Sequence, residues 1–301
     1  MTPFSICFYC AYANIISTMA ILLATDLDGT LFYPKRRIRL ISNKVKKFIQ
    51  KFIDEGNYFS VVSGRNIGPA NRVYKRLKRE GYAVGCNGAY ITEKGKVISS
   101  ETIEPNALLE LIEYIEKNYD IKEFYVMTDN DEFIMRNKFK SLFYRFVNFL
   151  WYFYQGALRN PYIVSKDKFY KAIKEGHAYK LMIMFGVSKK AIKTSEEANK
   201  DLYKKFGDRL ECSWSNEFIE ISPYGCSKSN KLKFLADYLK INHNDIFVVG
   251  DSGNDISMFK TFQEHSFCMN HAPLSVSKHA KYKIKRFEDI EKYLDESIER
   301  K

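Results

Sequence analysis

The sequence predicts an α/β protein in which a parallel sheet forms the core and a second, α+β domain is inserted into it. Three observations support this. Short apolar runs alternate with helix-period segments before residue 89 and again after residue 222, as in strand–helix–strand crossover units. Residues 89–222 instead mix helices with paired strands. At 301 residues, the chain is long enough for two domains.

Two carboxylates follow the first predicted strand, Ala20–Leu23. Asp26 and Asp28 are two residues apart, so the alternation of a strand places them on the same side of the chain. Gly29 then allows a sharp turn. Because open parallel sheets bind ligands at the carboxyl ends of their strands, we expect both acids to face a binding crevice.

The next core segments repeat this pattern. Ser42 is the expected N-cap of an amphipathic helix. The strand Tyr58–Val62 leads into Ser63-Gly64-Arg65, where a hydroxyl followed by glycine can cradle a phosphate. A further strand is predicted at Val84–Tyr90, interrupted by the turn pair Asn87-Gly88.

The inserted domain is predicted to leave the core after residue 88 and to return at Pro223. Its expected elements are a helix that begins at Pro105, paired strands at Phe124–Met127 and Glu132–Met135, a strand at Tyr179–Phe185, a helix at Lys189–Phe206, and a hairpin of Leu210–Trp214 with Phe218–Ile221.

An aromatic-rich stretch at residues 139–154 has two interpretations. It either packs as a helix beneath the inserted domain, or it forms an exposed patch for a dimer contact or an aromatic substrate. Lys140 and Arg145 interrupt it, which argues against a membrane span.

The core resumes with a second group of polar residues. Lys228 stands just before a helix, and the buried strand Ile246–Val249 is followed by Gly250-Asp251-Ser252-Gly253-Asn254-Asp255. Asn270-His271-Ala272 is interpreted as a loop, and we assign His271 no role. The remaining elements are a strand at Phe267–Met269 and a helix at Phe287–Ile298.

Polar residues thus gather at the ends of several strands. They are Asp26, Asp28, Ser63, Lys228, Asp251, Asn254 and Asp255. So many acids would repel one another unless a cation neutralised them. Oxygen ligands without Cys or His favour Mg²⁺, and a lysine in the same crevice suits a phosphate dianion. These residue types predict phosphoryl transfer through a carboxylate nucleophile.

In these motifs the sequence resembles the haloacid dehalogenase (HAD) superfamily, and within it the Cof-type (subfamily IIB) phosphatases. The resemblance covers residues 20–272 and is carried by Asp26-Leu-Asp28-Gly-Thr-Leu, Ser63-Gly-Arg, Lys228 and Gly250-Asp251-Ser-Gly-Asn254-Asp255. It implies a Rossmann-like hydrolase core of residues 19–88 plus 223–301, and an inserted type II, Cof-like α/β cap of residues 89–222 that closes over the site.

The resemblance also implies a role for each site residue. Asp26 would be the nucleophile, and Asp28 would protonate the leaving group and then activate water. Ser63 and Lys228 would hold phosphoryl oxygens. The implied Mg²⁺ ligands are Asp26, Asp28 through its carbonyl, Asp251 and, through water or hydrogen bonds, Asp255. The implied substrate-binding residues are Gly64, Arg65, Asn87, Gly88 and Asn254.

Three positions depart from the family pattern. Ser229 stands where the family usually has glycine, and Asn270-His271-Ala272 replaces the usual Gly-Asn-Ala. The usual Asn-Glu-Asp-Gly-Val-like loop is missing near Lys285-Arg286-Phe287. None of these departures removes an implied catalytic group.

The predicted function is a Mg²⁺-dependent phosphatase that acts on a small phosphorylated metabolite through an aspartyl-phosphate. Sugar phosphates, flavin mononucleotide (FMN) and pyridoxal phosphate (PLP) are candidate substrates. The alternatives are a phosphomutase of the same superfamily and a non-catalytic protein that binds a phosphometabolite. A need for a sugar bisphosphate activator would indicate the mutase, and unchanged function in Asp26→Asn would indicate the binding protein.

Composition bounds the partners and the compartment. The net charge is +12, but Lys and Arg are spread along the chain with no dense block beyond Lys35-Arg36-Arg37, which favours small anionic substrates over nucleic acid. Six cysteines without disulfide-framework spacing indicate a reducing compartment, the cytoplasm. Residues 1–18 are interpreted as a non-native or mis-assigned leader before a true start at Met19. The oligomeric state, monomer or homodimer, stays open.

Overall fold

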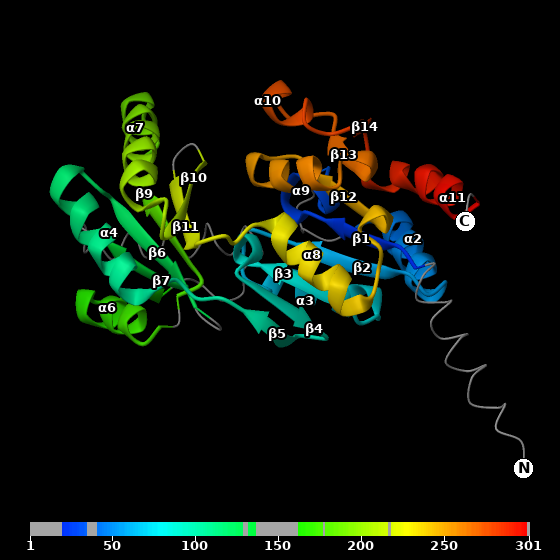
Figure 1. Ribbon diagram of the computed structural model, residues 1–301, viewed down its shortest axis with the longest axis horizontal. Coiled ribbons are helices and arrows are strands. Elements are labelled where there is room, and N and C mark those ends of the chain that lie inside the picture. Colours follow the sequence, from blue (N-terminus) through cyan, green and yellow to red (C-terminus); the bar gives the residue numbers. More distant parts are fainter. Residues whose placement is uncertain are drawn as a thin grey trace, which may run out of the picture. The chain divides into compact units, whose positions relative to one another are not determined.

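The structure is a computed structural model that describes residues 20–34, 41–128, 132–136, 162–176, 178–215 and 218–299. It divides into two compact units (Figure 1). We call residues 1–98 with 227–301 the core unit and residues 99–226 the inserted unit. The interpretations of residues 1–18 and of the aromatic stretch 139–154 concern segments outside the described residues.

The core unit is built on an eight-stranded sheet with the order β14-β13-β12-β1-β2-β3-β4-β5. The strands from β14 to β3 are parallel, and β1 lies between β12 and β2. Their bounds are β1 Leu22–Thr25, β2 Tyr58–Val62, β3 Tyr82–Gly85, β4 Tyr90–Glu93, β5 Lys96–Ser100, β12 Ile246–Gly250, β13 Ser266–Met269 and β14 Tyr282–Ile284.

Helices cover both faces of this sheet, as the apolar character of its central strands predicts. Ile21 and Leu23 point to one face and Leu22 and Ala24 to the other. On the first face lie α2 (Asn43–Asp54), α3 (Gly68–Leu77) and α11 (Glu291–Glu299). On the second lie α8 (Lys228–Leu239), α9 (Ile256–Thr261) and α10 (Leu274–Ser277).

The chain leaves the core sheet later than the predicted boundary at residue 88. The sequence predicts one interrupted strand at 84–90, whereas the structure has two, because the chain reverses at Asn87 and Gly88. Strand β4 pairs antiparallel with β3, with Gly85 opposite Tyr90. Since β4 and β5 extend the core sheet, the division between the units follows Ile98.

The inserted unit has a six-stranded sheet in the order β10-β11-β9-β6-β7-β8, antiparallel except for the β7–β8 pair. Of the residues described in this unit, three helices pack on one face of the sheet. The bounds are α4 Pro105–Asn118, β6 Glu123–Met127, β7 Glu132–Arg136, β8 Tyr162–Ile163, α6 Lys166–Lys174, β9 Lys180–Met184, α7 Lys189–Phe206, β10 Leu210–Ser215 and β11 Phe218–Pro223. The predicted fold class, a parallel α/β core with an inserted α+β unit, is confirmed.

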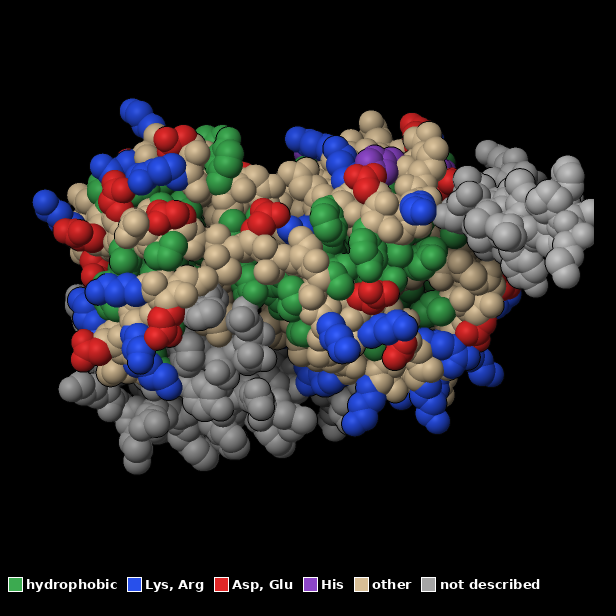
Figure 2. Space-filling model, turned by 60° about the horizontal axis from the view of Figure 1, so that its bottom comes forward, with side chains coloured by type: hydrophobic (Ala, Val, Ile, Leu, Met, Phe, Trp, Pro, Cys, Tyr) green, Lys and Arg blue, Asp and Glu red, His purple; other side chains and the backbone are tan. Residues whose placement is uncertain are grey.

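Charged side chains are mixed on the surface. On the face shown in Figure 2, Lys and Arg lie in several separate groups with acidic and apolar side chains between them. The described residues on this face therefore form no single continuous basic patch. Among the described residues, no helix combines the length and the apolar character needed to cross a membrane.

Phe206 and Tyr203 in α7 provide a matched test of how the inserted unit is held together. Phe206 is fully buried and packs edge-on against Tyr114, whereas Tyr203 is 62% exposed. We expect Phe206→Ala to lower the free energy of unfolding by about 3–5 kcal/mol, and Tyr203→Ala to change it by less than about 0.5 kcal/mol.

Urea titration followed by tryptophan fluorescence measures this difference, because both tryptophans, Trp151 and Trp214, belong to the inserted unit. Equal midpoints for the two variants would contradict the packing described here.

Candidate active site

The polar cluster forms where two neighbouring parallel strands end. Asp26 directly follows β1, and its backbone N–H donates to the carbonyl of Val249 in β12 at 2.9 Å. Asp251 directly follows β12. Because β1 and β12 are paired in register, their carboxyl ends place these two acids side by side.

Lys228, the first residue of α8, links the cluster. Its Nζ donates to Asp26 Oδ1 at 2.7 Å and to Asp255 Oδ1 at 2.7 Å. The lysine is only 1% exposed, and both carboxylates are buried. Charge-assisted hydrogen bonds of this length are strong, and removing one partner would leave uncompensated charge in the interior.

The second oxygen of Asp255 orders the loop after β12. Its Oδ2 accepts from the backbone N–H groups of Asp251 at 2.9 Å and Ser252 at 3.0 Å. Gly250 makes this approach possible, since a Cβ there would lie 2.5 Å from Asp255 Cγ. Asp255 therefore contacts both Lys228 and the backbone that carries Asp251.

Asp251 is held from the other side by the loop after β1. Thr30 Oγ1 donates to Asp251 Oδ1 at 2.9 Å. Gly29 has a φ of +84°, and a Cβ there would lie 2.2 Å from Asp251 Oδ2. Gly29 is thus required both for the turn and for the close approach of the carboxylate. Thr30 stands in the first motif, but its contact with Asp251 was not predicted.

Three carboxylates fit a divalent cation. Asp26, Asp251 and Asp255 each offer an oxygen, and these oxygens lie within 4.8 Å of one another. Carboxylate oxygens are the ligands of hard cations such as Mg²⁺. Both oxygens of Asp255 already accept hydrogen bonds, so Asp26 and Asp251 are better suited to direct ligation. The carboxylate of Asp28 is not in this group, and the resemblance implies only its backbone carbonyl as a ligand.

Asp28 instead pairs with Arg65. Arg65 Nε lies 2.7 Å from Asp28 Oδ2, and the two side chains are about equally exposed, at 40% and 38%. The expected acid–base residue is thus open to solvent, unlike the buried Asp26. The structure places Arg65 against this acid, and its role in binding substrate, which the resemblance implies, stays a prediction.

The remaining predicted residues come from the ends of β2 and β3. Ser63 is buried, and its Oγ accepts from the backbone N–H of Arg65 at 3.1 Å, with Gly64 between them. The N–H of Asn87 donates to the carbonyl of Ser63 at 3.1 Å. These bonds join the two strand ends into one rim.

Two contacts tie this rim to the carboxylate cluster. Asn254 Nδ2 donates to Asn87 Oδ1 at 3.1 Å. Gly88 has a φ of +109°, and a Cβ there would lie 2.4 Å from the carbonyl oxygen of Ser227, the N-cap of α8. The structure therefore brings all the predicted site residues to one edge of the core sheet.

Electrostatics indicate that the cluster needs further positive charge. Burial raises the pKa of Asp26, and Lys228 opposes this shift. Burial, followed by the charge of Asp255, also raises the pKa of Asp251. Burial alone would lower the pKa of Lys228, but Asp255 and Asp26 raise it above its ordinary value. The lysine stays charged, while the acids around it still favour a cation.

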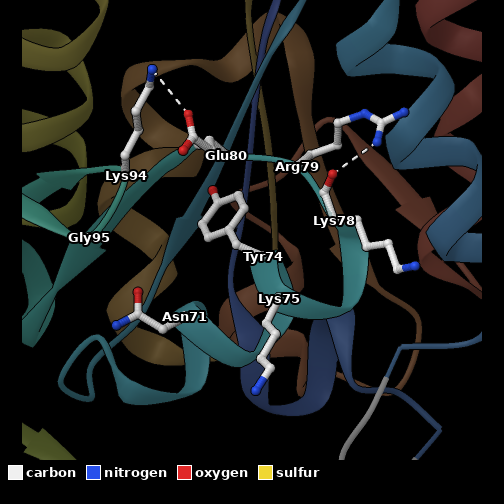
Figure 3. A pocket seen from close by; sticks show the side chains of 9 residues that line it. Asn71, Tyr74, Lys75, Lys78, Arg79, Glu80, Lys94 and Gly95 are labelled. Carbon is white, nitrogen blue, oxygen red and sulfur yellow. Dashed lines mark hydrogen bonds and ion pairs between the residues drawn. The ribbon is translucent and has the colours of Figure 1, made fainter.

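A cavity elsewhere in the core unit is separate from this chemistry. It has a volume of about 410 Å³ and lies between the end of α3 and the start of β3 (Figure 3). Three of its charged side chains already have partners: Lys94 and Glu80 pair with each other at 3.0 Å, and Arg79 donates to the carbonyl of Lys78 at 2.9 Å. Because β3 runs parallel to β1, whose carboxyl end carries the carboxylate cluster, the cavity lies at the opposite end of β3 from that cluster.

Comparison with known proteins places this site in a family. The profile of the haloacid dehalogenase-like hydrolases matches residues 23–291. The chain is 26% identical, over 83% of its length and 87% of the relative's, to the 5-amino-6-(5-phospho-D-ribitylamino)uracil phosphatase YwtE of Bacillus subtilis.

Two solved structures share the fold. BT1666 of Bacteroides thetaiotaomicron, a HAD-superfamily phosphatase, aligns with a TM-score of 0.73 and 19% identity over 93% of this chain and 95% of its own. The HAD subclass IIB sugar phosphatase BT4131 aligns with a TM-score of 0.71 and 18% identity over 92% and 98%.

The family match spans most of the chain, including Asp26, Lys228, Asp251 and Asp255, and the resemblance to the haloacid dehalogenase superfamily predicted from the four motifs is confirmed. The protein therefore belongs to the haloacid dehalogenase-like hydrolases.

Proposed function

We propose that this hydrolase is a Mg²⁺-dependent phosphatase that removes the phosphoryl group of a small metabolite through an aspartyl-phosphate on Asp26. The observation that carries the proposal is Lys228, which contacts Asp26 and Asp255 at 2.7 Å beside Asp251. A buried nucleophilic carboxylate, a fixed ammonium group and a cation-binding cluster are the parts that phosphoryl transfer requires.

In this proposal Asp26 attacks phosphorus. The alcohol of the substrate leaves, and the phosphoryl group becomes an acyl phosphate on the carboxylate. Lys228 orients Asp26 and offers positive charge to the phosphoryl oxygens, and Ser63 adds a hydroxyl at the neighbouring strand end. The cation, when bound by Asp26 and Asp251, would neutralise charge among the carboxylates and the phosphate.

Asp28 serves as acid and then as base. In this proposal its exposed carboxyl group would donate a proton to the leaving oxygen and afterwards accept a proton from the water that hydrolyses the acyl phosphate. Arg65, at 2.7 Å, orients Asp28 before substrate arrives. Gly64, Asn87, Gly88 and Asn254 would line the substrate side.

The relatives' names and the net charge of +12 support a small phosphorylated substrate. The relatives act on phosphorylated small molecules, a sugar phosphate and a ribitylamino-uracil phosphate by name. We propose sugar phosphates, FMN and PLP as the first compounds to test, and a cytoplasmic location. The four described cysteines that form no disulfide, Cys86, Cys212, Cys226 and Cys268, suit a reducing compartment.

Asp26→Asn tests the nucleophile. We expect the wild type to release phosphate from at least one of these metabolites, or from an activated aryl phosphate, in the presence of Mg²⁺ and not in the presence of EDTA. The variant should lose about 10³-fold or more in rate, because a nucleophile cannot be replaced by its amide. A dependence on an added sugar bisphosphate would indicate the mutase, and equal metabolite binding by both proteins without phosphate release would indicate a binding protein.

Asp28→Asn separates the two half-reactions. An activated aryl phosphate needs little proton donation to its leaving group, but the acyl phosphate still needs a base. We therefore expect a burst of phenolate close to one per enzyme molecule, followed by slow turnover. Mass spectrometry should find one added phosphoryl group, on Asp26. Full steady-state turnover in this variant would contradict the role of Asp28.

Lys228→Met tests the buried ammonium group, with the exposed Lys233 of the same helix as the control. Removing the ammonium group leaves the buried carboxylates of Asp26 and Asp255 without their positive partner, so the free energy of unfolding should fall by about 3–5 kcal/mol. The rate should fall by about 10²-fold or more. Thermal unfolding followed by circular dichroism, together with phosphate release, measures both effects. Lys233→Met should match the wild type, and a stable, active Lys228→Met protein would refute this assignment.

A further inference from the structure

His271 contacts Asp251 from the loop after β13. This loop follows the strand next to β12, so it lies at the same sheet edge as Asp251. His271 Nε2 is 3.4 Å from Asp251 Oδ2, and the two side chains are 34% and 15% exposed. The sequence alone assigned this histidine no role.

The imidazole ring is held both by its backbone and by a neighbouring ring. The N–H of Asn270 donates to the carbonyl of Ile284 at 2.8 Å. The N–H of Ala272 donates to the carbonyl of Met269 at 3.0 Å. Tyr33 stacks on the imidazole, with ring centroids 4.2 Å apart and an interplanar angle of 24°. The fold therefore fixes the place of this ring.

These contacts close a circuit around Asp251. Thr30 Oγ1 donates to Asp251 Oδ1 at 2.9 Å. The backbone N–H of Tyr33 donates to the carbonyl of Thr30 at 3.1 Å. Tyr33 in turn packs on His271, which contacts Oδ2 of the same carboxylate. The loop after β1 thus holds one oxygen of Asp251 directly and the other through the histidine.

This arrangement orients the carboxylate and still leaves it able to bind a cation. Each carboxylate oxygen has about two lone-pair sites, so one hydrogen bond at each oxygen leaves a lone pair at each. At 3.4 Å the histidine contact is longer than an ordinary N–H···O bond, about 2.7–3.2 Å. The histidine therefore guides Oδ2 more weakly than Thr30 guides Oδ1. Polar groups that orient metal ligands in this way raise the affinity for the metal.

We propose that His271 is a positioning residue of the cation site: its ring, fixed by Tyr33, holds Asp251 in the orientation that binds the cation. The histidine acts through Asp251 and does not itself contact the cation. The inference rests on the proposed function, which places a divalent cation there. Loss of the imidazole should weaken cation binding and leave the chemical step nearly unchanged once the cation is saturating.

Two substitutions of His271 separate its hydrogen bond from its packing. His271→Phe keeps a ring against Tyr33 but has no N–H, whereas His271→Gln brings an amide N–H close to the place of Nε2. Mn²⁺ serves as the probe, because it accepts the same oxygen ligands as Mg²⁺ and its free form gives a six-line EPR spectrum. We expect His271→Phe to weaken Mn²⁺ binding by about tenfold, the lower end for groups that orient metal ligands, and His271→Gln to recover most of this loss.

The dependence of phosphate release on Mg²⁺ supplies a second readout. In His271→Phe the Mg²⁺ concentration that gives the half-maximal rate should rise by the same factor as the Kd for Mn²⁺, while the rate at saturating Mg²⁺ stays close to that of the wild type. His279→Gln, which changes a histidine outside this circuit, should match the wild type in both measurements. Thermal unfolding without metal checks the fold, and we expect nearly equal midpoints because the stack on Tyr33 is kept.

Unchanged or tighter Mn²⁺ binding in His271→Phe, or an equal loss in both variants, would overturn the proposal. Asp251→Asn keeps this failure distinct from failure of the proposed function. If Mn²⁺ binding depends on Asp251 but not on His271, the histidine has no positioning role and the phosphatase proposal stands. If no Mn²⁺ binds in an Asp251-dependent manner, the proposed cation site itself is wrong, and the role of His271 falls with it.

Discussion

The fold of the core unit depends on one buried ionic contact, the ammonium group of Lys228 between the carboxylates of Asp26 and Asp255. The lysine and Asp26 are 202 positions apart in the sequence. Bringing them together requires β1 and β12 to be neighbours and α8 to begin at their carboxyl ends. Gly88 serves the same contact, because only a residue without a Cβ lets the loop after β3 lie against Ser227. A buried charge without its partners would destabilise the protein strongly, so these elements are mutually dependent.

This ionic contact alone does not balance the negative charge of the site. The ammonium group of Lys228 contacts only two of the three carboxylates, and burial raises the pKa of both Asp26 and Asp251. A cation would relieve this repulsion and stabilise the folded state by an amount that grows with the logarithm of its concentration relative to its Kd. A phosphate group brought to the same place then meets Lys228 and the cation rather than bare carboxylates. For the proposed phosphatase, this charge distribution favours binding of the cation before the phosphorylated substrate.

The sequence predicted the strand ends well because the motif residues follow short apolar runs directly. Asp26, Ser63 and Asp251 all stand where a buried strand stops, and chain order alone indicates this. Contacts between side chains from distant segments were not accessible in this way. The pairing of Asp28 with Arg65, the bond from Thr30 to Asp251 and the position of His271 depend on how three loops meet. The sequence predicted that Asn87-Gly88 interrupts a single strand, whereas the chain reverses there between two antiparallel strands. Hydrophobic periodicity does not distinguish a bulged strand from a hairpin.

The central claim is that Asp26 carries the phosphoryl group between substrate and water. The stereochemistry at phosphorus tests it most directly, with a phosphorothioate monoester made chiral by sulfur together with an oxygen isotope and hydrolysed in water that carries a different oxygen isotope. Two successive in-line displacements each invert the configuration, so a covalent intermediate on Asp26 predicts overall retention. Overall inversion would show that water attacks the substrate directly, and would contradict the account.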